Sequence, residues 1–344
     1  MAQTNFKVEM QPDLVLGEAA GISFGGGLRL AVNSKGLIYV GDWMNRNIRV
    51  FSADGALQET IGRSGQGPGE FSAIHQVIVG RNDSLYVFDA SAYRVSVYAP
   101  GKPHTLAYTL RIAVGNVQGH PSRFIVPADP SKGFLVVFIQ QGPGTLSVHP
   151  LDREGRANPR PVLEGKSTES TVRVAGGGAS VVRTSSLFAR EGLVGLTSAD
   201  ELYYGWSDNI DLTFYDLSGK WVGVFRANAP RIPVTARDVA YELEGASEMR
   251  RQALKNSTPP KTKPAVHTVM VDEKSWIWTG RYTADPSKSE WWVTQQKGGG
   301  VSAIFSLPDK VKLQVVRNGH AYGVSVDDMG APTVVRYEIK TKGE

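Results

Sequence analysis

The sequence predicts an all-β fold made of six copies of one four-stranded antiparallel unit, and three observations lead to that prediction. Residues 28–62 read as four short strands separated by turns, and residues 75–101 repeat the first three of them. Apolar and polar residues alternate inside each unit, which is the pattern of a strand with one buried face. Weaker copies follow at intervals of about 50 residues, apart from two wider intervals, and this period is typical of a β-propeller blade.

The second strand of the unit sets the register of the six copies. Its equivalents begin at Leu37, Leu85, Phe134, Leu202, Trp276 and Ala321. Asp54-Gly55 stands where the third and fourth strands of the first copy need a tight hairpin. The predicted blades are residues 28–74, 75–122, 123–188, 189–234, 265–309 and 310–341. No linker-like stretch divides the chain, so we expect one propeller domain over residues 1–344.

The sixth unit is one strand short. Its final segment, TVVRYEIKTKGE, supplies a third strand but leaves no residues for a fourth. The N-terminal segment 5–20 contains DLVLGE, which is similar to the fourth strand of the first unit. We therefore expect the N-terminal strand to complete the last blade, which closes the ring and leaves no open sheet edge at the seam.

Two segments carry a resemblance to a known family. GLIYVGDWMNRNIRVFSADG at 36–55 and the loop GRSGQGPGEF at 62–71 resemble six-bladed β-propellers with NHL-like repeats, and the loop is similar to that of bacterial exported members. This resemblance implies a periplasmic or extracellular location. Because the first ten residues lack the basic start and apolar core of a signal peptide, we expect a form without its signal sequence. The longest apolar run, residues 134–139, is too short for a membrane-spanning helix.

Two insertions interrupt the repeat. In the first, residues 235–263, Thr235 and Asp238 have the spacing of a helix capping box, and Gly245 weakens the helix that follows. We expect one or two helical turns on the rim between blades 4 and 5. The basic residues of this insertion are Arg250, Arg251, Lys255, Lys261 and Lys263. They form either a solvated helix face or a docking surface for an acidic partner. The second insertion, about 152–180, reads as a long loop or extended hairpin.

The sequence offers little positive support for an enzyme. Zero Cys excludes a thiolate nucleophile and a Cys-ligated metal. His75 and His267 begin the innermost strands of blades 2 and 5, which face each other across the ring, and no third His is in register. A shared metal needs nitrogen atoms about 2.0–2.1 Å from one ion, closer than opposite strands bring them. We therefore predict no metal and no cofactor. The resemblance implies one alternative, a metal-dependent lyase or lactonase with His75 and His267 as its best residues.

Asp42 and Asp89 end the second strands of adjacent blades. A calcium site would need several such carboxylates at one end of the tunnel. Because this Asp belongs to the repeat, we expect it to accept hydrogen bonds from backbone nitrogens of the following loop instead.

The remaining candidates lie on one face of the ring, where loops between second and third strands meet the loops that join blades. The candidate partner-binding residues there are Trp43, Met44, Tyr93, Trp206, Arg281 and Tyr282, joined by the insertion residues Arg250 and Arg251. Large aromatic residues with Arg are typical anchors of protein interfaces, although packing between blades also uses many of them. The net charge of +5 and pI of about 9.2 are too weakly basic to indicate nucleic-acid binding.

These observations favour a non-catalytic binding or scaffold protein. The expected partner is a protein, and specifically a membrane-protein assembly, for example an energy-transducing one, on which this chain docks as an extrinsic periplasmic subunit. A module that binds sugars or peptides at the tunnel mouth is the other alternative to the lyase or lactonase.

Overall fold

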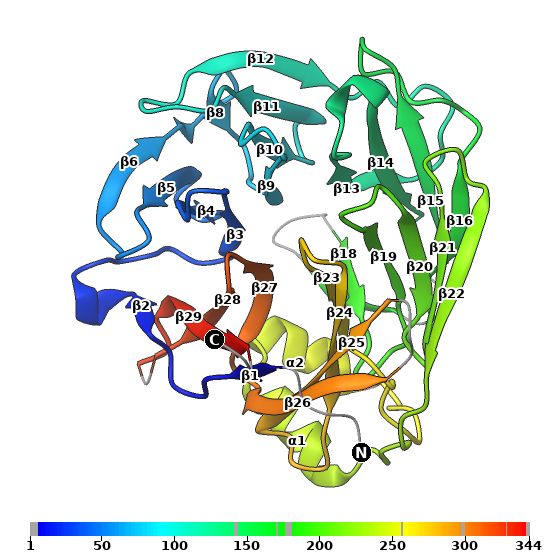
Figure 1. Cartoon of the computed structure of the whole chain (residues 1–344). Coiled ribbons are helices and arrows are strands. Elements are labelled where there is room, and N and C mark those ends of the chain that lie inside the picture. Colours follow the sequence, from blue (N-terminus) through cyan, green and yellow to red (C-terminus); the bar gives the residue numbers. More distant parts are fainter. Residues whose placement is uncertain are drawn as a thin grey trace.

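The computed structural model describes residues 6–140, 144–169, 171–175, 181–255, 257–296, 300–327 and 329–341. It contains six antiparallel sheets arranged around a central axis, with strands β3, β9, β13, β19, β23 and β27 innermost (Figure 1). The predicted six-bladed propeller of four-stranded sheets is thereby confirmed.

The blades follow one another along the chain. Blade 1 contains β3 (Arg29–Val32), β4 (Ile38–Asp42), β5 (Asn47–Phe51) and β6 (Leu57–Ile61). Blade 2 contains β9 (Gln76–Val79), β10 (Leu85–Asp89), β11 (Arg94–Tyr98) and β12 (Leu106–Arg111). Blade 3 contains β13 (His120–Ile125), β14 (Phe134–Ile139), β15 (Gly144–Leu151) and β16 (Leu163–Thr168). Blade 4 contains β19 (Gly192–Leu196), β20 (Leu202–Trp206), β21 (Ile210–Tyr215) and β22 (Trp221–Ala227).

Blade 5 contains β23 (Thr268–Val271), β24 (Trp276–Tyr282), β25 (Lys288–Gln295) and β26 (Val301–Pro308). Blade 6 contains β27 (Lys312–Arg317), β28 (His320–Val326) and β29 (Pro332–Thr341), together with β1 (Phe6–Val8) and β2 (Leu14–Leu16). Short elements complete the description, namely the 3-10 turns η1 (Glu18–Ala20) and η2 (Pro130–Lys132) and the parallel pair β7 (Arg63–Ser64) and β8 (Glu70–Phe71).

The N-terminal segment closes the ring, as predicted. It does so with two short strands rather than one, because β1 and β2 both pair antiparallel with the long strand β29. Phe6 lies opposite Thr341, and Leu14 lies opposite Arg336. Arg336 also makes an ion pair of 2.8 Å with Asp13. The sixth blade is thus held together by both ends of the described chain.

Each insertion forms its own small unit. The hairpin β17 (Thr171–Ala175) and β18 (Val181–Ser185) stands outside the sheet of blade 3, so that sheet spans His120–Thr168 instead of filling the predicted 123–188. Between blades 4 and 5 lie α1 (Ala236–Glu244) and α2 (Glu248–Lys255), longer than the one or two turns expected. The capping box is present, and Gly245 ends α1 without preventing a second helix.

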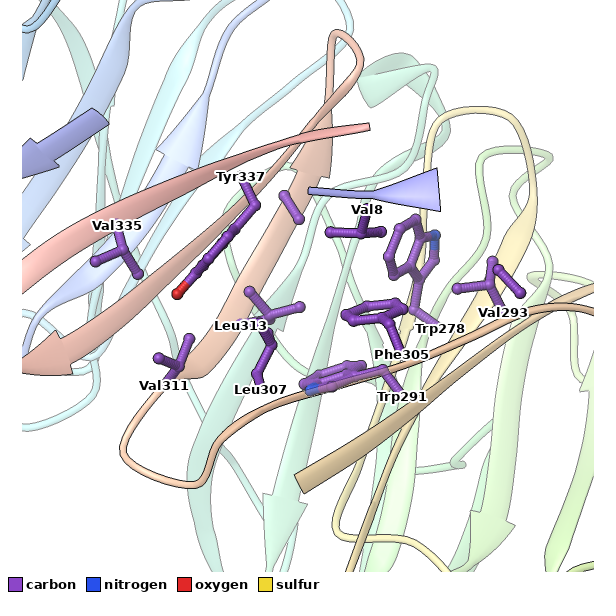
Figure 2. Close-up of a cluster of buried hydrophobic side chains, with 12 residues drawn as sticks. Val8, Trp278, Trp291, Val293, Phe305, Leu307, Val311, Leu313, Val335 and Tyr337 are labelled. Carbon is purple, nitrogen blue, oxygen red and sulfur yellow. The ribbon is translucent and has the colours of Figure 1, made fainter. Parts of the chain in front are cut away.

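The hydrophobic core lies between neighbouring blades. Figure 2 shows the cluster between blades 5 and 6, where Trp291 and Phe305 stack with ring planes 10° apart and Val8 of β1 joins from the N-terminal segment. Trp291 is 1% exposed. Inter-blade packing therefore uses some of the chain's large aromatic residues, and the closing strand contributes directly to the core.

One face of the ring carries the loops between second and third strands together with the links between blades, and we call it the connecting face. The backbone N–H of Met44, in the β4–β5 turn, donates to the carbonyl of Gly26 in the segment leading into β3. Because the hairpin and the two helices are also links between blades, they belong to this face. Neither these helices nor any other in the described chain is long and apolar enough to cross a membrane.

Candidate functional site

The β4–β5 turn exposes two large apolar side chains. Trp43 is 45% exposed and Met44 is 60% exposed. The backbone below them is tightly packed, because a Cβ at Gly25 would lie 2.8 Å from the Met44 Cβ and one at Gly27 would lie 2.9 Å from the Trp43 Cβ. Gly27 also has a φ of +65°, which favours glycine. The segment preceding β3 thus supports the turn at close range.

Asp42 fixes this turn from inside. Its fully buried carboxylate accepts hydrogen bonds from the backbone N–H groups of Gly25 at 2.7 Å and Asn45 at 3.0 Å. The guanidinium of Arg49 lies 3.4 Å from the same carboxylate and 4.2 Å from the ring centroid of Phe24. As expected, the repeated Asp bonds the loop that follows it, and it also bonds the segment that precedes the blade.

The same design recurs in blade 2. The Asp89 carboxylate accepts from the backbone N–H groups of Ser72 at 2.7 Å, Ala73 at 3.1 Å and Ala92 at 3.0 Å. Tyr93, in the turn that follows, is 37% exposed and adopts a positive φ of 50°. Asp89 therefore ties the β10–β11 turn to the link between blades 1 and 2.

The loop 62–71 joins the two turns. Arg94, which is 6% exposed, donates to the carbonyls of Gln66 at 2.7 Å and Glu70 at 2.5 Å. From the other side, Arg46 donates to the Ser64 hydroxyl at 2.8 Å. We call Trp43, Met44, Tyr93 and loop 62–71 the aromatic sector. Its backbone is pre-organised by charge-assisted hydrogen bonds, which are stronger than neutral ones.

The other predicted partner-binding residues of the connecting face are engaged within the protein. The guanidinium of Arg281 is buried, 2.6 Å from the Glu290 carboxylate and 4.0 Å from the ring centroid of Trp292. Tyr282 packs edge-on against Phe188. Trp206, in blade 4, lies with its ring 5.4 Å from the Lys166 ammonium. These three residues lie outside the aromatic sector.

The basic insertion is less available than its sequence indicates. Lys263 is 2% exposed, and its ammonium donates to Asp238 at 2.6 Å and to the carbonyl of Thr283 at 2.8 Å. Arg251 donates to the carbonyl of Leu243 at 3.0 Å, near the end of α1, and pairs with Glu248. Arg250 lines a cavity that is described below.

The central tunnel forms a cavity of about 450 Å³ lined by the innermost strands of all six blades. Several of its polar side chains link one blade to the next. Gln314 donates to the carbonyl of Leu28 and accepts from the N–H of Leu30, both at 3.0 Å. Gln76 accepts from Phe124 N–H at 2.6 Å, and Arg123 donates to the carbonyl of Val194. These bonds satisfy backbone groups that the inner edge of each sheet leaves unpaired.

The two His residues of the alternative enzyme site are not brought together. Neither lines the central cavity. His75 accepts a hydrogen bond at Nδ1 from the backbone N–H of Ala90 at 3.1 Å, and burial lowers its pKa against the opposing effect of Asp89. Burial lowers the pKa of His267 to about 4, so its imidazole is neutral at pH 7.

Metal ligation gains no support from the side chains in view. Within the described ranges, no group of three or more His, Cys, Asp or Glu residues is placed to hold a metal ion. The Asp42 and Asp89 carboxylates are each occupied by backbone N–H groups and a nearby Arg.

Sequence reasoning missed Arg94 and Arg46, which order the aromatic sector, and the polar residues that link the blades. A signal was present for the second group, because Arg29, Gln76 and Arg123 are polar residues on otherwise apolar inner strands. The role of Arg94 depends on a loop carbonyl cluster more than twenty residues away, which no local pattern encodes.

Comparisons with known proteins support the fold and little beyond it. A family model described as a 6-bladed beta-propeller (DUF5128) matches residues 28–101, which hold blade 1 and three strands of blade 2. No curated protein matches the chain.

Solved structures extend the likeness to the whole chain. A member of the DUF4221 family from Bacteroides vulgatus has a TM-score of 0.55 at 12% identity, over 98% of this chain and 99% of that one. A protein from Bacteroides fragilis, provisionally described as exported, has a TM-score of 0.56 at 11% identity over 99% and 96%. Virginiamycin B lyase from Staphylococcus aureus scores 0.48 at 8% identity over 97% and 99%, which carries no functional argument. The six-bladed fold is confirmed, and the NHL-like character of the repeat stays a prediction.

Proposed function

We propose that this protein is a binding module that docks on a protein partner through the aromatic sector of its connecting face. The observation that carries the proposal is the exposure of Trp43 and Met44 on a backbone held rigid by Asp42. A large apolar side chain on a mobile loop pays an ordering cost on binding, whereas one on a pre-organised turn loses little freedom.

The sector has the composition of an interface centre with a polar rim. Trp and Tyr are enriched among residues that dominate binding energy, and Met adapts its shape to the partner. Around them lie the strongly exposed Arg63 and its ion-pair partner Glu70, 2.9 Å apart. A partner surface with an apolar pocket for Trp43 and polar groups at its margin fits this arrangement.

The finer form of the proposal is an extrinsic subunit of a membrane-protein assembly, located in the periplasm. Three observations support it. The sequence resembles bacterial exported propellers, the Bacteroides fragilis protein of similar fold is provisionally described as exported, and the net charge of +5 suits an anionic membrane surface.

The experiment is affinity purification from detergent-solubilised membranes of the native source, followed by mass spectrometry and metal analysis of the same sample. We expect a stoichiometric membrane-protein partner that is lost with the variant Trp43→Ala. Trp221→Ala is the matched control, because Trp221 is 61% exposed on the outer strand β22, away from the connecting face.

Two results would count against the proposal. If Trp43→Ala and Trp221→Ala retained the partner equally, the aromatic sector would not be the docking site. If the protein were recovered alone with stoichiometric metal, the lyase or lactonase alternative would replace the binding module, and His75 and His267 would be the first residues to substitute.

A further inference from the structure

A second cavity of about 140 Å³ lies on the connecting face, where both insertions meet blades 4 and 5. Leu187 and Phe188, which follow the β17–β18 hairpin, form an apolar wall together with Leu254 of α2 behind them. Glu242 of α1 and His267 and Tyr282 of blade 5 line the same space. Segments from three separate parts of the chain therefore build this cavity.

Three polar side chains in this cavity lack partners. Across the described residues, the Glu242 carboxylate, the His267 imidazole and the Tyr282 hydroxyl form no hydrogen bond and no ion pair with protein groups. The Nε2 atom of His267 is fully buried, and the ring is enclosed edge-on by Tyr282 at 5.2 Å and Trp291 at 6.0 Å between centroids. Buried polar groups are normally satisfied, so three unsatisfied ones in one cavity indicate a missing ligand.

The helix that carries Glu242 provides an internal comparison. Asp238 lies four residues earlier, on the same side of α1. Its carboxylate accepts from Lys263 at 2.6 Å and from the Thr235 backbone and hydroxyl at 2.8 and 2.7 Å. One carboxylate of this helix face is thus fully used by the fold, while the other is left for a group from outside.

The protonation states define what that group must be. Burial lowers the pKa of His267 to about 4, so the neutral ring offers one acceptor nitrogen at neutral pH. Burial, with repulsion from Glu242, raises the pKa of Tyr282, so its hydroxyl keeps its proton and its oxygen can accept. Burial and repulsion from Asp309 raise the pKa of Glu242. Two carboxylates, Glu191 and Glu242, and one cation, Arg250, line the cavity, which disfavours an anionic ligand.

We propose that this cavity binds a small primary ammonium compound, whose three N–H donors meet Glu242, His267 and Tyr282. An ammonium group has three donors and no acceptor, which matches three unpartnered acceptors. Phe188 and Leu187 contact its apolar body. A cavity of about 150 Å³ holds a molecule of benzene's size, so the body has about five to seven heavy atoms.

The test is isothermal titration calorimetry of the full chain with n-butylamine at pH 8, where the amine is protonated and a carboxyl group is ionised. We expect one saturable site with a Kd on the order of 1 mM or tighter. The variant Glu242→Gln should weaken binding at least tenfold. Glu244→Gln is the matched control, because Glu244 is an exposed carboxylate two residues along the same helix, and its Kd should stay within twofold.

A neutral analogue separates this proposal from plain apolar binding. n-Butanol has the same shape without the charge, and we expect it to bind at least tenfold more weakly. Equal binding of n-butanol, an unchanged Kd for Glu242→Gln, or no saturable binding of n-butylamine would each overturn the proposal. If Glu242→Gln fails to melt cooperatively, Tyr282→Phe removes one acceptor while keeping the ring, and a threefold or greater loss of affinity is expected.

Discussion

Blades 1 and 5 present the same repeat position in opposite ways. Gly41 and Gly280 both lie opposite the first residue of their innermost strand, so Trp43 and Tyr282, two residues later, are equivalent. Trp43 is exposed on a bare turn, whereas Tyr282 is covered by Phe188 and the segment around α1 and α2. The repeat decides where an aromatic residue stands, and the insertions decide whether a partner can reach it.

The residue between them differs as well. Asp42 in blade 1 organises its turn by accepting hydrogen bonds, and Asp89 does the same in blade 2. Arg281 occupies that position in blade 5, where it pairs with Glu290 across the sheet. Blade 5 has therefore lost the acceptor that binds the incoming link, and helices with their own capping box and the buried Lys263–Asp238 pair anchor that link instead.

The largest expected effect breaks the organised side of this comparison. Asp42→Ala leaves the N–H groups of Gly25 and Asn45 unpaired and Arg49 without its carboxylate. We expect the free energy of unfolding to fall by about 3–4 kcal/mol, measured by urea denaturation. Asp54→Ala is the control, since this carboxylate is exposed in a hairpin, and a comparable loss there would show that Asp42 has no special role.

A pH titration tests the covered side. Because burial lowers the pKa of His267 to about 4, the unfolded chain binds more protons than the folded one between about pH 6.5 and 4. Its contribution to stability is complete above the unfolded pKa and is lost as the pH falls through this window, by on the order of 2–3 kcal/mol.

The matching measurement is thermal or urea unfolding of the wild type and of His267→Phe at pH 7 and pH 4.5. The variant should lose less stability on acidification than the wild type. An identical pH dependence in both proteins would mean that other groups, such as the carboxyls near blade 5, account for the acid sensitivity.

The smallest effect compares the equivalent aromatic residues directly. Tyr282→Ala should lower the free energy of unfolding by about 2 kcal/mol, because it removes contacts to Phe188 and His267. Trp43→Ala should change it by no more than about 0.5 kcal/mol, as expected for an exposed side chain. Chemical denaturation of the two variants side by side is sufficient, and equal losses would show that both residues serve only packing.

The sequence was informative wherever the repeat operates. The alternation around Leu37 and Leu85 predicted the sheets, and the missing fourth strand of blade 6 predicted the closure, because each depends on local pattern or on simple counting of strands. Trp43, Met44 and Tyr93 were placed by the same register.

The insertions were beyond such reasoning. That Phe188 covers Tyr282, and that Glu242 shares a cavity with His267, depends on contacts among segments with no period in common. The sequence pattern also treated Lys263 as part of a basic surface, since nothing local shows that Asp238, twenty-five residues earlier, buries it.

The closing strands have a consequence for the folding order of the chain. Phe6 and Thr341 pair in one sheet, and Val8 enters the core between blades 5 and 6. Contacts of such sequence separation form late, because the loop they close is nearly the whole chain. While synthesis or translocation is incomplete, β29 or its neighbours present an open sheet edge to other molecules. Until the last blade has arrived, the first strand has nowhere to bind, and the growing protein depends on protection from aggregation.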